Sequence, residues 1–584
     1  MEPVEIIEEA LDVPIPDAPA LRLDDARRLT GPGLLWSRAG AVLDVLHDGS
    51  IDPDRIVALW DKQARRVLDA LGWQDETLTH RRYDGGVSLA LSAPMDQLYS
   101  AIFAAQTAWH FCAADLLDRE PGDFAAMVDD VRGVMAREAN PPLPALIAAA
   151  ADHGIDILCD DDDISIGQGT GSRTWPVHDL PAPGDVDWAA LHDVPVAMIT
   201  GTNGKTTTTR LCAAIATAAG RVAGLTSTEF VMVGGDILDR GDYSGPGGAR
   251  LLLRDRRLET GFLEVARGGI LRRGLPTRHV RAALVTNVAA DHLGQYGVNT
   301  VPELAQAKFA VHRALAPGGV LVLNADDPHV VDEAARTRAT TWWFALSPDA
   351  AKIGAARAAG TPCAWADTGN LWFFDGTTAH DIMPVADIPI AMGGAARHNI
   401  ANALGALCLS RALGIGDEAI RAGMARFRPD ASDNPGRCNE FAVNGARVFV
   451  DFAHNPHSIA AMADTMAAIP AKRRFAMLSH AGDRSDGDIR DLTMGVLALD
   501  PDMVVAAEIE DYLRGRSPGE LPALIRRTCL DAGMAADAVL TAGSPRDGAE
   551  RILDMVGPGD LALLLVLSDR ARVFELLEQR GIAV

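Results

Sequence analysis

One segment, VPVAMITGTNGKTTTTRLCAAIATA, constrains the fold of this chain more than any other feature. An apolar strand runs into a glycine-containing loop and a helix follows at once, which is the setting that a phosphate-binding loop requires. Gly201 and Gly204 allow the backbone to turn tightly and to aim N–H groups at phosphate oxygens, and Lys205 adds a positive charge. Thr206 offers a hydroxyl group to Mg²⁺. The alternative is a glycine-rich turn before a threonine-capped helix, but strand, loop, Lys-Thr pair and helix together favour a phosphate site.

Short apolar strands alternate with helical stretches in the rest of the chain after this segment. The strands are FLEVA, AALVTNV, GGVLVLNAD, ARVFVDFAH, RRFAMLSHAGD, MVVAAEI and DLALLLVLSD. Strands separated by helices predict right-handed βαβ units and parallel sheets, so the expected fold class is α/β. The number of units allows two sheets, with a break near the turn-rich FRPDASDNPGR.

The first part of the chain has a different pattern of predicted helices and strands. Residues 95–117 are Ala-rich and predict a helix, and Gly86–Ser92 predicts a strand, so residues 1–160 read as an N-terminal α+β domain. Residues 161–190 are rich in Asp, Gly and Pro and predict a linker. We expect a central phosphate-loop domain with a parallel sheet in residues 191–428 and a Rossmann-like C-terminal domain in residues 429–584.

Charge and composition exclude several classes of protein. The chain has 54 Lys and Arg against 79 Asp and Glu, a net charge of −25, which argues against binding to nucleic acid or to an anionic membrane. Its seven cysteines form no CxxC pair, so neither a disulfide framework nor a zinc ribbon is indicated. No apolar run approaches the ~18 residues of a membrane span, and the acidic N-terminus lacks the apolar core of a signal peptide. We therefore expect a cytoplasmic protein.

Acidic and imidazole side chains follow two of the predicted strands. Glu264 closes FLEVA, and Asp291 and His292 follow AALVTNV. Ligand groups gather at the carboxyl ends of strands in such sheets, so Glu264 and His292 could join Thr206 in a metal site. Taken singly, each has a plainer alternative: a loop histidine with ordinary hydrogen bonds, and a capping or ion-paired carboxylate.

Several segments taken together resemble the Mur ligase family of ATP-dependent amide-forming enzymes. They are, in order, GTNGKTTTT, LEVARGGILRRGL, TNVAADHLG, LNADDP, RHNIANALGAL, NPGR and VDFAHNP. Within that family, EVARGGILRRGL, GDYSGP and AGDRSDGDIRDL are similar to the Mur-like half of the cyanophycin synthetases rather than to the cell-wall ligases. LTGPGLLWSRAGAVLDV and SIGQGTGSR extend the resemblance to the first domain of those synthetases, so it covers nearly the whole chain.

One domain of the cyanophycin synthetases is missing between these two parts. Those enzymes carry an ATP-grasp domain there, whereas only a short segment separates SIGQGTGSR from the phosphate loop in this chain. In that family the ATP-grasp site joins Asp to the backbone, and the Mur-like site joins Arg to the Asp side chain. The resemblance therefore implies only the second kind of reaction.

The resemblance also implies roles for individual residues. Catalysis would rest on Lys205, Glu264, His292 and Lys308, and the Mg²⁺ ligands would be Thr206, Glu264, His292 and Lys308, the last as a carbamylated lysine. Without the resemblance, Lys308 would read as a solvent-facing lysine on a helix. The residues expected to bind ATP are Gly201, Thr202, Asn203, Gly204, Lys205, Thr206, Thr207, Asn287, His398, Asn399, Asn402, Arg437, Asp451, His454 and Asn455.

Two segments depart from the family patterns. Where cyanophycin synthetases typically read TTDG, this chain has STEF, and Glu229 adds a charge near the presumed substrate loop. If Glu229 lined the amine site, its replacement by Gln would raise the KM for a cationic amine more than for a neutral one. The segment DNPGR resembles the diaminopimelate-reading DNPR motif only superficially, because it lies before DFAHNP, and we interpret it as an ATP-contact turn.

Two functions follow as expectations. The first is an ADP-forming, ATP-dependent ligase that joins an amino acid to a small-molecule or peptide carboxylate, and the resemblance implies that this amino acid is a basic one. The alternative is a catalytically inactive nucleotide-binding scaffold that partners a separate ATP-grasp ligase. A cell-wall or folate-type ligase is a third option, against which the N-terminal domain and EVARGGIL count. Asp483 and Glu508 are candidate bases for the amine. The identity of both substrates stays open, as does assembly into a homo-oligomer.

Overall fold

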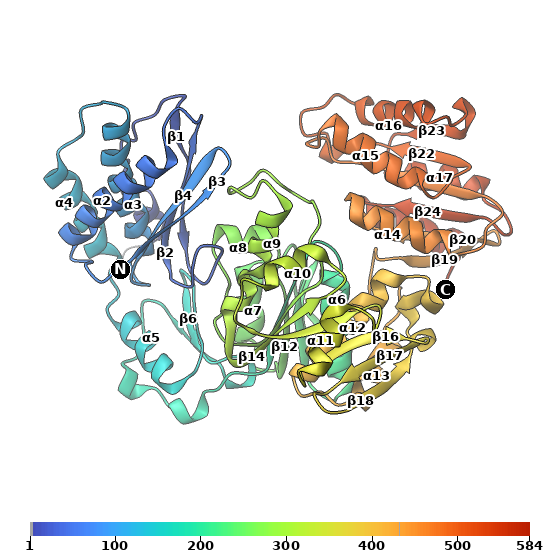
Figure 1. The fold of residues 1–584 in the computed structure, drawn as a ribbon, viewed down its shortest axis with the longest axis horizontal. Helices are drawn as coiled ribbons and strands as arrows, with labels where there is room; N and C mark the ends of the chain where they lie inside the picture. The colour runs from blue at the N-terminus through green and yellow to red at the C-terminus, as the bar shows by residue number, and fades with distance from the viewer. Residues whose placement is uncertain (1–3, 431) are drawn as a thin grey trace.

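The computed structural model describes residues 4–430 and 432–584, in which the chain forms four sheets (Figure 1). Residues 1–3 and 431, which fall in the predicted N-terminal domain and in the predicted break, lie outside the described residues. The expected α/β class is confirmed, with two small antiparallel sheets in the first part of the chain and two large sheets rich in parallel strands. Among the described residues, no helix is long and apolar enough to cross a bilayer.

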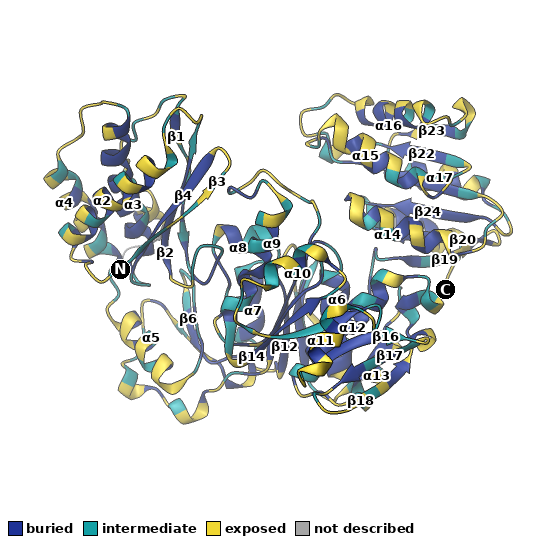
Figure 2. Cartoon of the chain, viewed as in Figure 1, coloured by how far each residue is buried: buried dark blue, intermediate teal, exposed yellow. Residues whose placement is uncertain are grey.

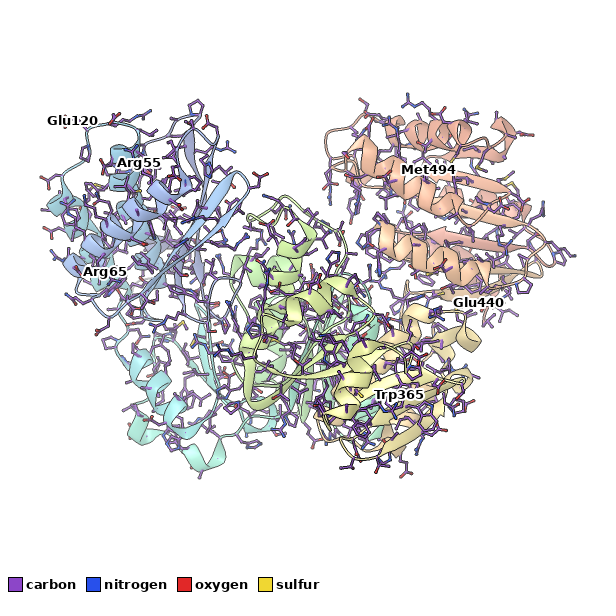
Figure 3. All side chains as sticks on the ribbon, in the orientation of Figure 1. Arg55, Arg65, Glu120, Trp365, Glu440 and Met494 are labelled. Carbon is purple, nitrogen blue, oxygen red and sulfur yellow. The ribbon has the colours of Figure 1, made fainter. Side chains whose placement is uncertain are left out.

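The N-terminal sheet is antiparallel throughout and carries helices on one face (Figure 1). Asp52 starts the long helix α2 by accepting a hydrogen bond from the Asp54 amide, and Gly72 ends it in a left-handed conformation. Its buried apolar residues pack mainly on α3 and also on the sheet, while Arg55 and Arg65 lie on its more exposed side (Figure 3). The sheet order is β1 (Leu21–Leu29), β2 (Gly40–His47), β4 (Gly86–Ser92) and β3 (Leu78–Tyr83), and the helices are α1 (Val4–Glu8), α2 (Pro53–Leu71), α3 (Leu98–Leu116) and α4 (Phe124–Glu138).

The segment predicted as a linker contains regular structure. After α5 (Pro142–His153), strands β5 (Ile157–Cys159), β6 (Asp163–Ile166) and β7 (Arg173–Pro176) form a small antiparallel sheet. Its Asp-rich turn is held by ion pairs: Asp160 pairs with Arg254 of the central region at 2.7 Å, and Asp161 pairs with Arg28 of β1. The acidic run therefore makes tertiary contacts, and two strands lie within the segment that its composition predicted as a linker.

The central sheet holds the phosphate loop at its middle. The inner strands β9, β12, β8, β13, β14, β15 and β16 run parallel, and antiparallel hairpins extend both edges. Strands β8 and β12 are buried on both faces, as expected where helices cover a parallel sheet. Figure 2 shows β12 in the dark blue of buried residues. The order is β11 (Asp236–Arg240), β10 (Phe230–Val233), β9 (Ala223–Thr226), β12 (Thr260–Glu264), β8 (Val196–Thr200), β13 (Val280–Val285), β14 (Leu315–Asn324), β15 (Thr340–Ala345), β16 (Cys363–Asp367), β17 (Asn370–Phe374) and β18 (Ala379–Pro384). The helices are α6 (Lys205–Ala218), α7 (Pro246–Arg254), α8 (Arg267–Arg272), α9 (Val301–Phe309), α10 (Pro328–Ala334), α11 (Ala351–Ala358), α12 (Arg397–Ala412) and α13 (Asp417–Arg426).

The C-terminal sheet is a separate layer with helices on both sides (Figure 1). Five strands are parallel, and β19 and β25 close one edge in the antiparallel sense. The order is β23 (Val539–Ala542), β22 (Met503–Ala507), β21 (Arg474–Leu478), β24 (Leu561–Leu565), β20 (Ala446–Asp451), β19 (Asn439–Val443) and β25 (Ile582–Ala583), with helices α14 (Pro456–Ala467), α15 (Asp486–Leu497), α16 (Glu520–Asp531), α17 (Pro545–Met555) and α18 (Arg570–Arg580). The carboxyl ends of β20 and β21 thus bring the DFAHNP and SHAGD segments to one edge of this sheet.

Candidate active site

The phosphate loop connects β8 to α6 and is shaped by two glycines. Gly201 has φ +149° and Gly204 has φ +85°, a region that side chains rarely adopt. A Cβ at Gly201 would lie 1.9 Å from Thr286 Oγ1, and one at Gly204 would lie 2.2 Å from Asn402 Oδ1. Gly204 precedes the first residue of α6, so the amino end of that helix opens onto the loop. Lys205 Nζ donates to the Thr202 carbonyl at 3.0 Å.

The side-chain amide of Asn287, just after β13, holds this loop through two hydrogen bonds to the main chain of Asn203. The Asn203 amide N–H donates to Asn287 Oδ1 at 2.9 Å, and Asn287 Nδ2 donates to the Asn203 carbonyl at 3.0 Å. Thr202 Oγ1 also donates to the Ala289 carbonyl at 3.0 Å. The loop conformation is therefore set by its neighbour strand before any ligand arrives.

Glu264 offers one free oxygen beside the phosphate loop. Its Oε2 accepts a hydrogen bond from Thr206 Oγ1 at 2.9 Å, while its Oε1 is buried and has no hydrogen-bond partner among the described residues. Burial raises the pKa of this carboxyl group, and Lys205 opposes that shift. A buried carboxylate oxygen without a partner next to a hydroxyl group is a donor set that fits Mg²⁺.

Lys308 lies inside the protein rather than on a solvent-facing helix surface. Its side chain is 4% exposed, and its Nζ donates to the Gly201 carbonyl at 2.8 Å. Burial and the nearby Lys205 hold the pKa of Lys308 well below its usual range, and Asp291 partly opposes this. The amine is thus biased towards its neutral, nucleophilic form.

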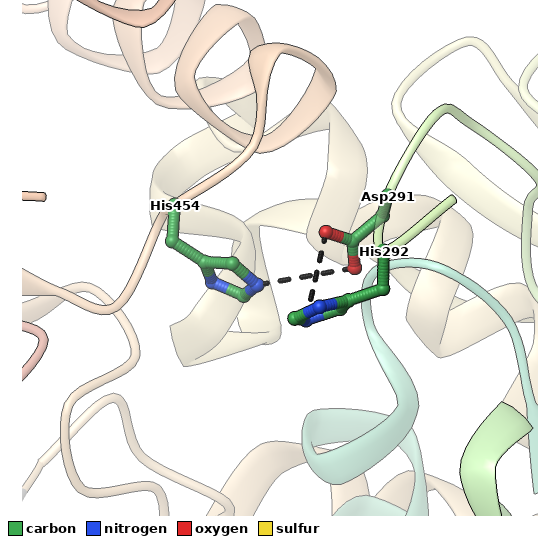
Figure 4. A group of neighbouring side chains, drawn as sticks. All are labelled: Asp291, His292 and His454. Carbon is green, nitrogen blue, oxygen red and sulfur yellow. Dashed lines mark ion pairs between the residues drawn. The ribbon is translucent and has the colours of Figure 1, made fainter. Parts of the chain in front are cut away.

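His292 lies with Asp291 and His454 (Figure 4). His292 Nε2 is 3.8 Å from Asp291 Oδ1, and His454 Nε2 is 4.0 Å from Asp291 Oδ2. The ligand atoms of these three residues lie within 4.8 Å of one another, and they come from the loop after β13 and from the loop after β20. The structure therefore brings Thr206 and Glu264 into contact but groups His292 with two residues that were not expected as its partners.

A second group of expected residues starts α12. Asn399 donates to the Ile390 carbonyl at 2.9 Å, and Asn402 donates to Asn399 Oδ1 at 3.1 Å, so both amides are fixed by local bonds. Burial lowers the pKa of His398 to about 4, and His457 of α14 adds to the shift. His398 is therefore neutral near pH 7 and suited to lie against a neutral ring such as a nucleotide base.

The C-terminal region supplies a cation that lies over an aromatic ring and a buried carboxylate. Arg437 places its guanidinium group 4.7 Å from the centre of the Phe452 ring. Asp451 accepts backbone N–H bonds from Cys438 and Ala453 at 2.8 Å and 2.7 Å, and burial raises its pKa against the opposing charge of Arg437.

Asn455 joins the two large domains directly. Asn203 Nδ2 donates to Asn455 Oδ1 at 3.1 Å, and Asn455 Nδ2 donates to Asn203 Oδ1 at 2.9 Å. Asn203 Nδ2 also lies 2.9 Å from His457 Nδ1. The tip of the phosphate loop is thus capped by the amino end of α14.

One cavity of about 1110 Å³ collects nearly all of the expected residues. Those that line it are Thr202, Asn203, Gly204, Lys205, Thr206, Thr207, Glu264, Asn287, His292, Lys308, His398, Asn399, Asn402, Arg437, Asp451 and His454. Gly201 and Asn455 lie behind this lining, where they contact Lys308 and Asn203. Asp483 and Glu508 do not line the cavity, so neither is placed to act as the base for the amine.

Sequence reasoning missed the partners of Glu229. Its Oε2 accepts a bond from Arg210 at 2.5 Å and its Oε1 accepts one from Arg570 at 2.6 Å, so two cations already neutralise it. Burial raises the pKa of Glu229, but Arg210, Arg570 and Arg437 outweigh it and leave the pKa below its usual value. Arg570 is the first residue of α18 and lies 341 residues after Glu229, so no local sequence pattern predicts their ion pair.

Comparison with known proteins assigns this fold and site to a class. Residues 199–410 match the family model of the Mur ligase middle domain, and residues 436–565 match that of the Mur ligase glutamate ligase domain. The chain belongs to the Mur ligase family, as its segments indicated. It is similar to the cyanophycin synthetase of Trichormus variabilis, with 36% identity over 391 residues.

The coverage of these comparisons is partial. The alignment with that synthetase takes in 67% of this chain but 43% of the synthetase, so the chain spans less than half of its length. The UDP-N-acetylmuramoylalanine–D-glutamate ligase of Acidobacterium capsulatum is 31% identical over 322 residues, which are 52% of this chain and 60% of that ligase. E. coli FolC in complex with ADP shares the fold, with a TM-score of 0.50 and 20% identity over 66% of this chain and 90% of FolC.

Proposed function

We propose that this protein is an ATP-dependent, ADP-forming ligase that joins a substrate carboxylate to the amine of an amino acid. The observation that carries the proposal is the convergence, in one cavity, of a phosphate loop, a carboxylate oxygen of Glu264 without a partner among the described residues, and Arg437 and Asp451 of the C-terminal domain. The names of the Mur ligase relatives support the same class of reaction.

The reaction needs an activated acyl group because hydroxide is a poor leaving group. The substrate carboxylate oxygen attacks the γ-phosphorus of ATP, the bond to the β-phosphate oxygen breaks, and ADP leaves. Lys205 and the amino end of α6 neutralise the charge that develops on the transferred phosphoryl group. The amine nitrogen then attacks the acyl carbon, phosphate leaves, and the nitrogen loses a proton as the amide forms.

Thr206 and Glu264 are the residues best suited to hold Mg²⁺, and His292 faces the cavity from the opposite loop. When bound, the ion neutralises the negative charge of the phosphates. Lys308 contributes once its neutral amine has bonded to CO₂ and lost a proton, because the resulting carbamate would turn a buried amine into an anionic ligand. Its depressed pKa supports this role.

The substrate classes rest on the resemblance. A carboxylate-bearing amino acid or short peptide is the expected acceptor, and an amino acid is the expected amine. The resemblance to the cyanophycin synthetases suggests a basic amine. Glu229 is already paired with Arg210 and Arg570, so its charge does not favour binding of a basic side chain.

The proposal is tested by a screen of carboxylate and amino-acid pairs with ATP and Mg²⁺, in which ADP release is followed and the product is identified by mass. We expect ADP release that depends on both substrates and a product heavier than the acceptor by one amino-acid residue. Tight ATP binding without an amide from any pair would favour the alternative, an inactive scaffold for a separate ATP-grasp ligase.

A further inference from the structure

The tip of the β3–β4 hairpin in the N-terminal domain contacts the loop that precedes α9 (Figure 1). This loop, residues 291–300, is called the Asp291 loop below, and it begins at the cavity with Asp291 and His292. Arg81 of β3 donates to the main-chain carbonyls of Gly297 and, at 3.3 Å, Tyr296. The same guanidinium group lies 3.4 Å from Glu303, whose carboxylate caps α9. One side chain thus fixes both the tip and the end of the loop.

Three further contacts reinforce this junction. The Tyr83 ring packs on Gly297 so closely that a Cβ there would lie 2.4 Å from the ring. Arg27 of β1 places its guanidinium group 4.7 Å from the centre of the Tyr296 ring. Asn299 Nδ2 donates to the Asp84 carbonyl at 3.2 Å. All three reach the Asp291 loop from the N-terminal domain, which itself does not line the cavity among the described residues.

The conformation of the Asp291 loop needs such outside support. His292 and Tyr296 have φ of +49° and +54°, which costs free energy for any residue other than glycine. Within the loop, the main-chain bonds from Gly294 to Val298 and from Val298 to Gln295 close one tight turn. That turn leaves Asp291 and His292 outside it, so their place at the cavity depends on how the turn is held.

We propose that Arg81 and Tyr83 are positioning residues, through which the N-terminal domain holds the Asp291 loop so that Asp291 and His292 face the cavity. The N-terminal domain is then part of the active site without touching a substrate. The inference rests on the proposed function only where it concerns Mg²⁺ and turnover, because the contacts themselves concern the shape of the loop.

The chain offers a matched control for Arg81 in the next residue. Side chains alternate along a strand, so Arg82 points away from the Asp291 loop and pairs with Asp54 of α2 at the surface. Arg81→Ala should speed hydrogen exchange of the amides of residues 290–300 at least about tenfold and weaken Mn²⁺ binding, measured by electron paramagnetic resonance with ADP present, by about tenfold. Arg82→Ala should change neither quantity.

A second variant tests the junction without removing Arg81. Tyr83→Ala removes the ring that packs on Gly297 and should raise exchange in the same residues, even if Arg81→Ala destabilises the N-terminal domain as a whole. Unchanged exchange of residues 290–300 in both folded variants would overturn the proposal. Faster exchange with unchanged Mn²⁺ binding would overturn the metal part of it. If exchange rises as expected but no substrate pair yields an amide, the ligase assignment fails and the positioning role stands.

Discussion

Lys205 is the residue whose replacement should lower ATP turnover most directly. It begins α6, lines the cavity and donates to the Thr202 carbonyl rather than packing in the core. Lys205→Ala should therefore lower ATP turnover by about 100-fold or more while leaving the fold and melting temperature unchanged. Steady-state ADP release at saturating ATP measures this, with the exposed Lys62 of α2, replaced by Ala, as the control. Equal turnover in both variants would remove the phosphate-loop assignment.

The dependence of turnover on Mg²⁺ tests whether Glu264 and His292 are metal ligands. Glu264→Gln keeps an oxygen for the Thr206 hydroxyl group but removes the charge, and His292→Ala removes a ring at the cavity. Each should raise the Mg²⁺ concentration for half-maximal turnover by about tenfold, since one ligand is lost. Glu259→Gln, an exposed site next to β12, is the matched control. Metal titrations that overlay the wild type for both variants would place the ion elsewhere.

We expect His480 to make the stability of the C-terminal domain sensitive to acid. It follows β21, is buried, and neither ring nitrogen has a hydrogen-bond partner among the described residues. Burial lowers the pKa of His480 to about 3. Below the unfolded-state pKa of about 6.5, the unfolded chain binds a proton that the folded chain does not, so this term lowers the free energy of unfolding as the pH falls towards 3.

His480→Leu should therefore reduce the drop in melting temperature between pH 7 and pH 5 by several degrees, because an apolar side chain carries no titration cost. Calorimetry of the variant and wild type at both pH values measures the difference. The exposed His178, replaced by Leu, should leave the drop unchanged. A drop equal to that of the wild type in His480→Leu would show that other groups cause the acid sensitivity.

At the scale of elements, the connection between β9 and β10 meets α18 through Glu229. The sequence suggested that Glu229→Gln would raise the KM for cationic amines selectively. The two guanidinium groups that bind Glu229 change that expectation. In Glu229→Gln, both Arg210, whose side chain is only 4% exposed, and Arg570 would lose their anionic partner. Glu229→Gln should then loosen the docking of α18 and raise the KM for ATP and for every amine by about tenfold.

Kinetics with one cationic and one neutral amine test this expectation, and Arg570→Gln should give the same pattern because it removes the other half of the bridge. A KM for ATP equal to the wild type, with only the cationic amine affected, would restore Glu229 as an amine ligand.

Elements with a local signature were predicted well. The strands around the phosphate loop are buried on both faces and alternate with helices, so their sequence alone predicted β8, β12, β13 and β14. The short antiparallel strands β5–β7, β10 and β11 were missed. Each spans only three to five residues, which is too few to show a clear alternation of apolar and polar side chains, and β6 and β11 also contain acidic residues. Composition alone cannot separate such strands from a linker.

At the scale of the whole molecule, the candidate site depends on contacts between segments far apart in sequence. The phosphate loop and the DFAHNP segment were each predictable, but the reciprocal amide bonds between Asn203 and Asn455 were not. Nothing in either segment shows which face of one domain meets the other. The same holds for Arg81, whose role becomes visible only once the hairpin and the Asp291 loop lie side by side. Residue types were therefore easier to predict than their partners.

Docking of the C-terminal domain should couple ATP use to amide formation. Asn455 is fully buried, bonds Asn203 and caps α14, so we expect the docked C-terminal domain to limit access of water to the phosphate loop. Asn455→Ser retains a side chain that can cap the helix but is too short for the amide pair. We expect ADP release without acceptor to rise several-fold, and the ratio of ADP to amide product to exceed one. Parallel assays of ADP and product measure this, with Asn370→Ser on β17 as the control. A ratio of ADP to amide product equal to one in Asn455→Ser would mean that the Asn203–Asn455 bonds do not prevent ATP hydrolysis.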